Sequence, residues 1–154
     1  MKLSSSLLFV LFFTLSQAQN NIETKFLPPA GYERIYNDEY SKFLRQKPLK
    51  QKNILKYHNG QVRFNKANDI FAAVFDYDIG RLDLHQCADA AIYLRANYNY
   101  MFGFLDKLAY TFTNGEVTTY KDYLAGAKYR AVNGGDDIEK VYEKSREDNF
   151  KTFR

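Results

Sequence analysis

The residues best suited to chemistry surround the only cysteine of this 154-residue chain, in the string DLHQCADA at residues 83–90. The apolar pattern that follows predicts a helix that begins at Asp83. Cys87 therefore lies near the helix N-terminus, where backbone N–H groups and the helix dipole stabilise a thiolate over a thiol. This placement makes Cys87 the candidate nucleophile of a cysteine hydrolase.

A structural role for Cys87 is the alternative. Cys87 shares a helical stripe with Leu84 and Ala88, and a small thiol on such a stripe packs well in a core. The chain has two histidines that could serve as a base. His85 lies two positions from Cys87 and points in a different direction on a helix, whereas His58 is expected at a turn. The nucleophilic and the buried interpretations both stay open.

A binding surface is the alternative to catalysis. The side chains expected to contact a ligand beside the thiol are Asp83, Gln86, Asp89, Tyr93 and Tyr98. In this interpretation a set of rings presents aromatic surface to a glycan or a protein, namely Tyr93, Tyr98, Tyr100, Phe102 and Phe104. Rings on an exposed face beside a groove favour binding, whereas rings buried against the predicted strand at residues 69–79 belong to the core.

Composition restricts the classes of partner. The net charge of +4 is spread along the chain, so nucleic acid is not an expected partner. The chain has 13 Tyr and 13 Phe but no Trp, and such enrichment usually indicates core and half-buried sheet faces. Zinc-spaced Cys and His, phosphate-binding glycine loops and dinucleotide fingerprints are missing from the sequence, so we expect no metal and no cofactor. The carboxylates of residues 76–83 do not have the spacing of an EF-hand.

The first residues have the pattern of a signal peptide. Lys2 precedes an apolar run over residues 7–15, and small residues surround Ala18. We expect cleavage after Ala18, so that residues 1–18 form the signal peptide and residues 19–154 form one domain of an exported, periplasmic or secreted protein. The apolar run is too short to span about 30 Å of hydrocarbon as a helix, and no later part of the sequence is apolar enough to do so.

Hydrophobic periodicity predicts an α+β fold in which antiparallel strands pack on a central helix that carries Cys87. We expect four helices. The first follows Asp38 and ends before Pro48, the second and third cover residues 83–100 and 119–124, and the last begins at Asp136. The expected strands cover residues 53–57, 61–64, 69–79 and 107–113. We expect the strand at residues 69–79 and the Cys87 helix to form the centre of the fold. Gly134 and Gly135 are expected to form a flexible joint.

Several short strings together resemble one exported bacterial family. They are PPAGYER (28–34), FLR (43–45), PLK (48–50), NG (59–60), AV (73–74), DIG (78–80), DLHQCADA (83–90), LRA (94–96) and FTNG (112–115). On these strings the chain is identified as a member of the domain of unknown function 4846 family, of Bacteroidetes type. The usual family pattern has glutamine in place of His85, so the resemblance gives that histidine no essential role.

The family is in turn similar to NlpC-type papain-fold hydrolases, which cleave peptide or amide bonds in cell-wall material. This resemblance implies that Cys87 is the nucleophile and that its backbone N–H helps to bind the oxyanion. Family members are longer, and the Gly-His strand that follows in them has no counterpart in this sequence. The resemblance therefore implies the front part of an incomplete papain-like fold, inactive alone, with cell-wall peptide or glycan as its partner.

Overall fold

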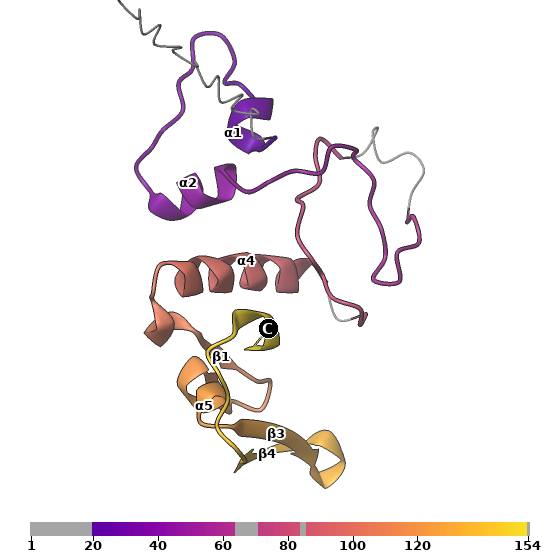
Figure 1. Ribbon diagram of the computed structural model, residues 1–154, viewed down its shortest axis with the longest axis vertical. Helices are drawn as coiled ribbons and strands as arrows, with labels where there is room; N and C mark the ends of the chain where they lie inside the picture. The colour runs from indigo at the N-terminus through magenta and orange to yellow at the C-terminus, as the bar shows by residue number, and fades with distance from the viewer. Residues whose placement is uncertain (1–19, 64–70, 84–85, 154) are drawn as a thin grey trace, which may run out of the picture.

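The structure, a computed structural model, describes residues 20–63, 71–83 and 86–153 (Figure 1). The helices are α1 (Ile22–Lys25), α2 (Glu39–Arg45), α4 (Cys87–Met101), α5 (Tyr120–Leu124) and α6 (Phe150–Phe153), with short 3₁₀ turns η1 (Leu105–Lys107) and η2 (Asn133–Gly135). The strands are β1 (Ala109–Thr111), β2 (Val117–Thr119), β3 (Ala127–Val132) and β4 (Asp137–Tyr142). They form two antiparallel pairs, β1 with β2 and β3 with β4. The predicted signal peptide lies outside the described residues.

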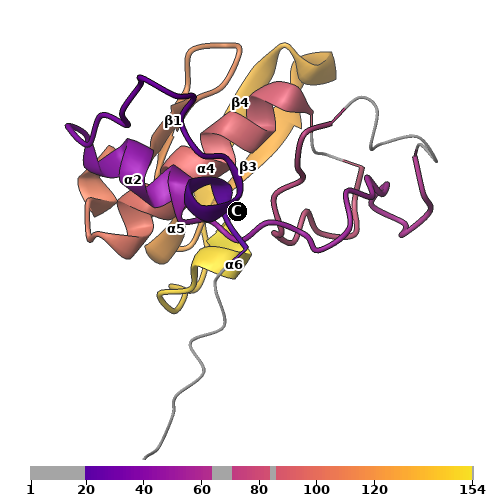
Figure 2. The ribbon, with the colours of Figure 1, turned by 90° about the horizontal axis from the view of Figure 1, so that it is seen from above.

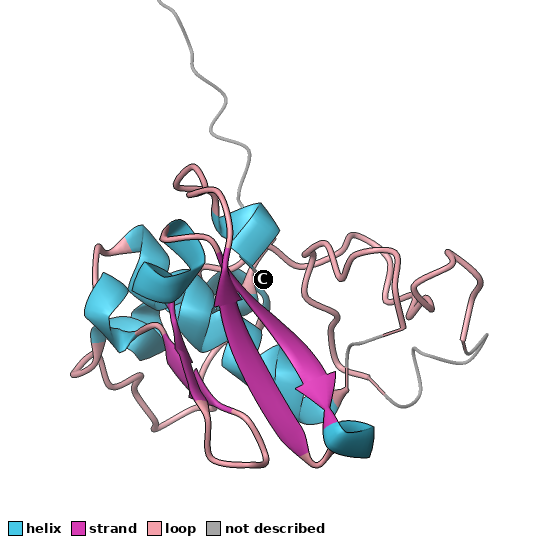
Figure 3. Ribbon diagram, turned by 90° about the horizontal axis from the view of Figure 1, so that it is seen from below, coloured by secondary structure: helices cyan, strands magenta, loops and turns pink. Residues whose placement is uncertain are grey.

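Helix α4 lies between two groups of elements. Helices α1 and α2 lie on one side of it, and the strands, α5 and α6 lie on the other (Figure 1). The described residues 46–63 and 71–83, between α2 and α4, run mainly as loops beside the helices and strands (Figures 2 and 3). The predicted α+β class and the predicted helix that contains Cys87 are therefore confirmed.

Helix α2 confirms the predicted helix after Asp38. The Asp38 carboxylate accepts hydrogen bonds from the backbone N–H groups of Tyr40 at 3.2 Å and Ser41 at 2.8 Å. These bonds satisfy donors that have no partner within the first turn of a helix. The buried ring of Phe43 then meets Tyr98 of α4 edge-on, with 5.3 Å between the ring centroids.

Helix α4 starts later than predicted. Its N-cap is Gln86 rather than Asp83, and Cys87 is its first residue. The backbone N–H of Gln86 donates to the carboxylate of Asp89 at 2.8 Å, so Asp89 rather than Asp83 closes the first turn. Asp83 lies apart from the helix, with its Oδ1 3.5 Å from Nδ1 of His58.

The predicted strand at residues 69–79 is wrong in its described part, residues 71–79. Leu49 and Phe75 form one isolated bridge, flanked by two backbone hydrogen bonds of 2.9 and 2.8 Å. Burial nevertheless alternates at most positions: Ala72, Asp76 and Asp78 are exposed, and the other residues from Phe71 to Ile79 are half-buried. Alternating burial needs only one covered face of the segment. A ladder of backbone hydrogen bonds needs a long neighbouring strand, and residues 48–50 are too short to provide one.

Residues 57–61 form the turn expected beside His58, but the predicted strands at residues 53–57 and 61–64 are wrong in their described parts. Gly60 has φ +85°, and the Tyr57 N–H donates to the Gln61 carbonyl at 2.8 Å. A single bridge then joins residues 56 and 62. The last residue of the predicted second strand lies outside the described part of the chain. The Asn-Gly pair therefore sets the reversal without forming a ladder.

The helix predicted to begin at Asp136 is wrong, because residues 137–142 form strand β4. This strand pairs with β3 from Val132 opposite Asp137 to Ala127 opposite Tyr142. The predicted flexible joint is a tight turn within η2, where Gly134 has φ +75°. Strand β3, which was not predicted from the sequence, pairs with residues 137–142, and this pairing overrides their local helix preference.

The predicted elements at residues 107–113 and 119–124 contain β1 and α5 respectively. The Thr119 hydroxyl caps α5 by accepting the Asp122 N–H at 3.0 Å, and Gly126 with φ +92° follows the helix end. The buried cluster of the core consists of Ala96 on α4, Leu108 before β1 and Tyr120 on α5. Half-buried side chains pack around this cluster, and they are Tyr100, Tyr110, Tyr123, Leu124, Phe150 and Phe153.

A carboxylate fixes the segment that leads into α6. Asp148 accepts hydrogen bonds from the hydroxyls of Tyr120 and, at 2.7 Å, of Tyr100. Both bonds lower the pKa of Asp148, and the bond from Tyr120 has the larger effect. Burial is the main cause that raises the pKa of Tyr120. Arg146 adds hydrogen bonds from Nη1 to the carbonyls of Tyr123 and Ala127 at 3.0 and 2.9 Å. The C-terminal segment is therefore tied to α4, α5 and β3.

Candidate functional site

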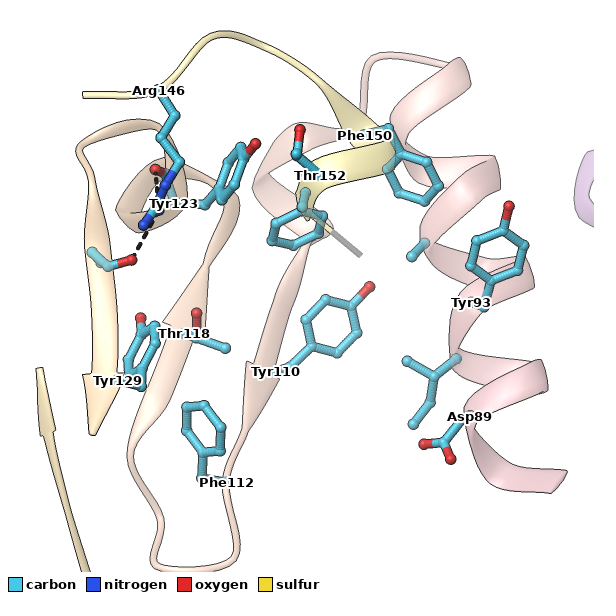
Figure 4. Close-up of a pocket in the computed structure, with 14 residues that line it drawn as sticks. Asp89, Tyr93, Tyr110, Phe112, Thr118, Tyr123, Tyr129, Arg146, Phe150 and Thr152 are labelled. Atoms are coloured by element: carbon cyan, nitrogen blue, oxygen red, sulfur yellow. Dashed lines mark hydrogen bonds between the residues drawn. The ribbon is translucent and has the colours of Figure 1, made fainter. Parts of the chain in front are cut away.

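A cavity of about 610 Å³ lies between α4 and the strands, beside α6, and we call it the main groove (Figure 4). Helix α4 contributes Asp89, Ile92 and Tyr93 to its lining, and the strand side contributes Tyr110, Phe112 and Tyr129. Most of these side chains are aromatic or aliphatic, and they come from separate parts of the sequence. The groove is therefore a product of the tertiary fold.

The β1–β2 hairpin places two of these rings on one face. Tyr110 and Phe112 are half-buried, whereas Thr111 between them is exposed, as the period of a strand requires. The turn that follows is held by the Glu116 N–H, which donates to the Asn114 side chain at 3.1 Å. Both rings consequently face the main groove (Figure 4).

Tyr129 joins the second hairpin to this wall. Its ring centroid lies 5.0 Å from that of Phe112, so the two hairpins meet through their rings. The Tyr129 hydroxyl is buried and has no hydrogen-bond partner among the residues that the structure describes. A buried hydroxyl without a partner costs free energy, so this atom is suited to bond a polar group that enters the groove.

The charged groups of the main groove are few and lie at its edges. Asp89 accepts the Gln86 N–H at the first turn of α4, where the helix dipole favours a negative charge. The Arg146 guanidinium is engaged by backbone carbonyls and lies 5.0 Å from the centre of the Tyr123 ring. Burial raises the pKa of Tyr110, so its hydroxyl stays neutral. The groove therefore offers apolar contact and neutral hydroxyls.

The structure separates the five residues predicted to bind a ligand. Asp89 and Tyr93 line the main groove together. Gln86 caps α4, and Asp83 lies beside His58. Tyr98 packs against the rings of α2 on the other side of α4.

The predicted aromatic surface is also divided. Tyr98 lies 4.8 Å from Phe102 and 6.0 Å from Phe104, measured between ring centroids. Tyr100 instead packs on Tyr120 and Phe150 in the core region. Tyr93 is the member of the set that lines the main groove. The five rings therefore do not form one binding face.

Cys87 is exposed at the first helical position of α4. Ala88 and Ala91, which share its predicted stripe, are exposed as well, so the prediction that this stripe faces the core is wrong. Within the described residues, the Cys87 thiol has no hydrogen-bond or charged partner. His58 contacts Asp83, and His85 lies outside the described part of the chain. The structure therefore presents an accessible thiol but no assembled catalytic pair.

Several residues that line the main groove were not predicted from the sequence. Tyr110 and Phe112 fall in the predicted strand at residues 107–113, and their spacing of two could have identified a shared aromatic face. Tyr129 lies on β3, an element that was not predicted, and Phe150 and Phe153 lie on α6, at the end of the helix predicted from Asp136. Their contribution depends on how the strands pair, which no local pattern reports.

The described residues contain no group of three or more His, Cys, Asp or Glu side chains placed to hold a metal ion. Within the same residues, no helix has the length and apolar character needed to cross a membrane.

The fold and site define an α+β protein with an aromatic groove along a helix that starts at an exposed cysteine. A family model described as domain of unknown function (4846) matches residues 22–154, so the chain belongs to that family. The matched range includes α4 and every residue named in the main groove. Neither the curated proteins nor the solved structures contain a match to the chain.

Proposed function

We propose that this chain is a binding component of the cell envelope that holds an extended peptide, such as cell-wall peptide, in the main groove. The observation that carries the proposal is the convergence of Tyr93, Tyr110, Phe112 and Tyr129 on one cavity of about 610 Å³. Ligand sites commonly enclose roughly 300–1,000 Å³ and combine an apolar lining with a few placed polar groups. The main groove has both properties.

The chemistry of the lining favours a peptide over a glycan. A sugar presents a hydroxyl on most of its carbons and requires many hydrogen-bonding partners, whereas an apolar peptide side chain requires none. The strand side of the groove supplies rings, and its buried polar atom without a partner is the Tyr129 hydroxyl. One backbone amide of a peptide would satisfy that hydroxyl while neighbouring side chains cover the rings.

The test is calorimetric titration of the mature chain, residues 19–154 after the predicted cleavage, with a synthetic hexapeptide that has two central leucines. Phe112→Ala removes a ring from the groove wall, and we expect binding to weaken about tenfold or more. Tyr129→Phe removes one hydroxyl, and we expect a loss of about fivefold. Tyr32→Ala is the matched control, because Tyr32 is 76% exposed and lies outside the main groove.

Equal affinity of the Phe112→Ala and parent chains would contradict the site. Binding of N-acetylglucosamine oligomers without binding of the hexapeptide would overturn the peptide assignment. Circular dichroism of each variant separates lost binding from lost folding.

Nucleophilic catalysis by Cys87 is a second candidate function. Its specific support is the exposed thiol at the first residue of a 15-residue helix, where backbone N–H groups favour a thiolate. No base lies with that thiol in the described residues, so we expect the purified chain to hydrolyse cell-wall peptide no faster than Cys87→Ala does. Faster iodoacetamide reaction at pH 7 in the folded than in the unfolded chain would support an activated thiol. A slower reaction in the folded chain would exclude it.

A further inference from the structure

We infer that the peptide continues from the main groove into a second groove, where an acidic side chain or carboxylate of the same ligand binds. This side groove has a volume of about 430 Å³ and lies between residues 50–60 and 71–79. The inference rests on the proposed function, because it assigns the chemistry of the neighbouring part of the same ligand.

A stacked pair of tyrosines connects the two grooves. Tyr93 lines the main groove, and Tyr77 lines the side groove. Their ring centroids are 5.0 Å apart and their planes differ by 17°. An extended peptide advances about 3.3 Å per residue, so a few residues suffice to pass from one groove to the other over this pair.

The lining of the side groove favours a negative charge. Lys50, Lys56 and His58 line it, together with one carboxylate, that of Asp78. Asp78 accepts the Gly80 N–H at 2.8 Å. Neither Lys50 nor Lys56 forms an ion pair with another described residue. The two ammonium groups are therefore available to a carboxylate that enters from the main groove.

His58 is a further polar group of the side groove. Its Nδ1 atom is buried and makes no hydrogen bond within the described residues, and the carboxylate of Asp83 remains 3.5 Å away. A buried ring nitrogen without a hydrogen bond is unusual in a folded protein. A polar ligand group in the side groove would add a hydrogen bond to an imidazole that already contacts the Asp83 carboxylate.

The linings of the two grooves together favour a peptide in which apolar side chains are followed by acidic ones. The experiment compares two hexapeptides by calorimetry with the mature chain, one with two leucines followed by two glutamates and one with glutamines in place of the glutamates. At low salt we expect the glutamate peptide to bind about fivefold tighter, since exposed ion pairs are individually weak. We expect the preference to shrink as salt rises to about 0.5 M, because salt screens exposed charges.

The double variant Lys50→Gln, Lys56→Gln should abolish the preference for glutamate and leave the glutamine peptide unaffected. Lys121→Gln with Lys144→Gln is the matched control, because it removes the same charge from exposed positions outside both grooves. A preference that survives in the Lys50 and Lys56 variant, or equal binding of both peptides to the parent chain, overturns the inference and leaves the proposed function standing. Failure of both peptides to bind overturns the proposed function and the inference with it.

Discussion

Residues 86–153 hold their shape differently from the described residues 46–63 and 71–83. In the first region, helices and strands share a buried cluster, and hydrogen bonds of Asp148 and Arg146 tie distant segments together. In the second region, isolated bridges and the turn at Gly60 replace continuous ladders within the described residues.

This difference assigns different roles to the two grooves. The main groove is built on α4 and the strands, so its rings are positioned by packed secondary structure. The side groove is built from loop segments, where few contacts resist small movements. We therefore expect the main groove to select its ligand by shape and the side groove to adapt to the charge that enters it.

The largest effect should come from the cores of the two regions. Leu108→Ala empties a fully buried position within the central cluster, and we expect a loss of about 3 kcal/mol in the free energy of unfolding. Leu49→Ala removes the same atoms from a buried position among loops, which can relax around the gap, so we expect a smaller loss of about 2 kcal/mol. Urea denaturation of both variants checks the difference, and equal losses would remove the contrast between the regions.

The second effect concerns the contact of the C-terminal segment with Gly126. A Cβ atom at this position would lie 2.6 Å from the carbonyl oxygens of Glu143 and Lys144, and φ there is +92°. We expect Gly126→Ala to cost about 2 kcal/mol or more through the clash and the backbone strain. Gly115→Ala is the control, because it meets open space at φ +90° and should cost about 1 kcal/mol. Thermal melts that rank the two variants in reverse would contradict the packing described.

The third effect concerns the tyrosine bonds to Asp148. Tyr120→Phe removes a buried hydroxyl bond and should cost about 1 kcal/mol at neutral pH. The folded-state pKa of Asp148 is lowered, so its contribution to stability is present above the unfolded value of 3.8 and is lost as the pH falls through the folded value. The variant should therefore lose less stability than the parent chain below about pH 4. Denaturant midpoints of both chains at pH 2.5, 4 and 7 measure this difference in stability. The same pH dependence of the midpoint in both chains would exclude a stabilising role for the bond between Tyr120 and Asp148.

The smallest effect lies in the looped region. The Asn53 side chain donates to the carbonyls of Phe71 at 3.5 Å and Ala72 at 3.1 Å, and so joins two loop segments. Asn53→Ala should cost less than about 1 kcal/mol overall, because these bonds are partly exposed. Hydrogen exchange should accelerate at residues 71–76 and stay unchanged in α4. Faster exchange throughout the protein would show that the two regions unfold as one unit.

Elements with signals close in sequence were predictable. Helix α2 begins after Asp38 and α5 follows the Thr119 cap, because each cap bonds N–H groups two or three residues away. The start of α4 was misjudged for a related reason, since the capping carboxylate is Asp89 inside the helix rather than Asp83 before it. A carboxylate three residues after Gln86 is a local signal that could have corrected the boundary.

Features that depend on distant partners were not predictable. Residues 137–142 have apolar positions compatible with a helix, yet they pair with β3 across the η2 turn. For the same reason, Asp89 and Tyr93 on the predicted helix were identified as binding residues, whereas Tyr129 on β3 was missed. The exposure of Cys87 likewise depends on which face of α4 meets the strands, and the periodicity of small residues favoured the wrong face.

The central claim is that the main groove binds a peptide, and an NMR titration of the ¹⁵N-labelled protein with the leucine hexapeptide tests it most directly. The account predicts saturable shift changes at the amides of β1, of Phe112 and of β3 around Tyr129, and at Ile92 and Tyr93 on the facing helix. It also predicts that Phe112→Ala moves these changes to about tenfold or more higher peptide concentration while the spectrum stays folded. Shift changes confined to the exposed rings at Phe102 and Phe104, or none at saturating peptide, would contradict the claim.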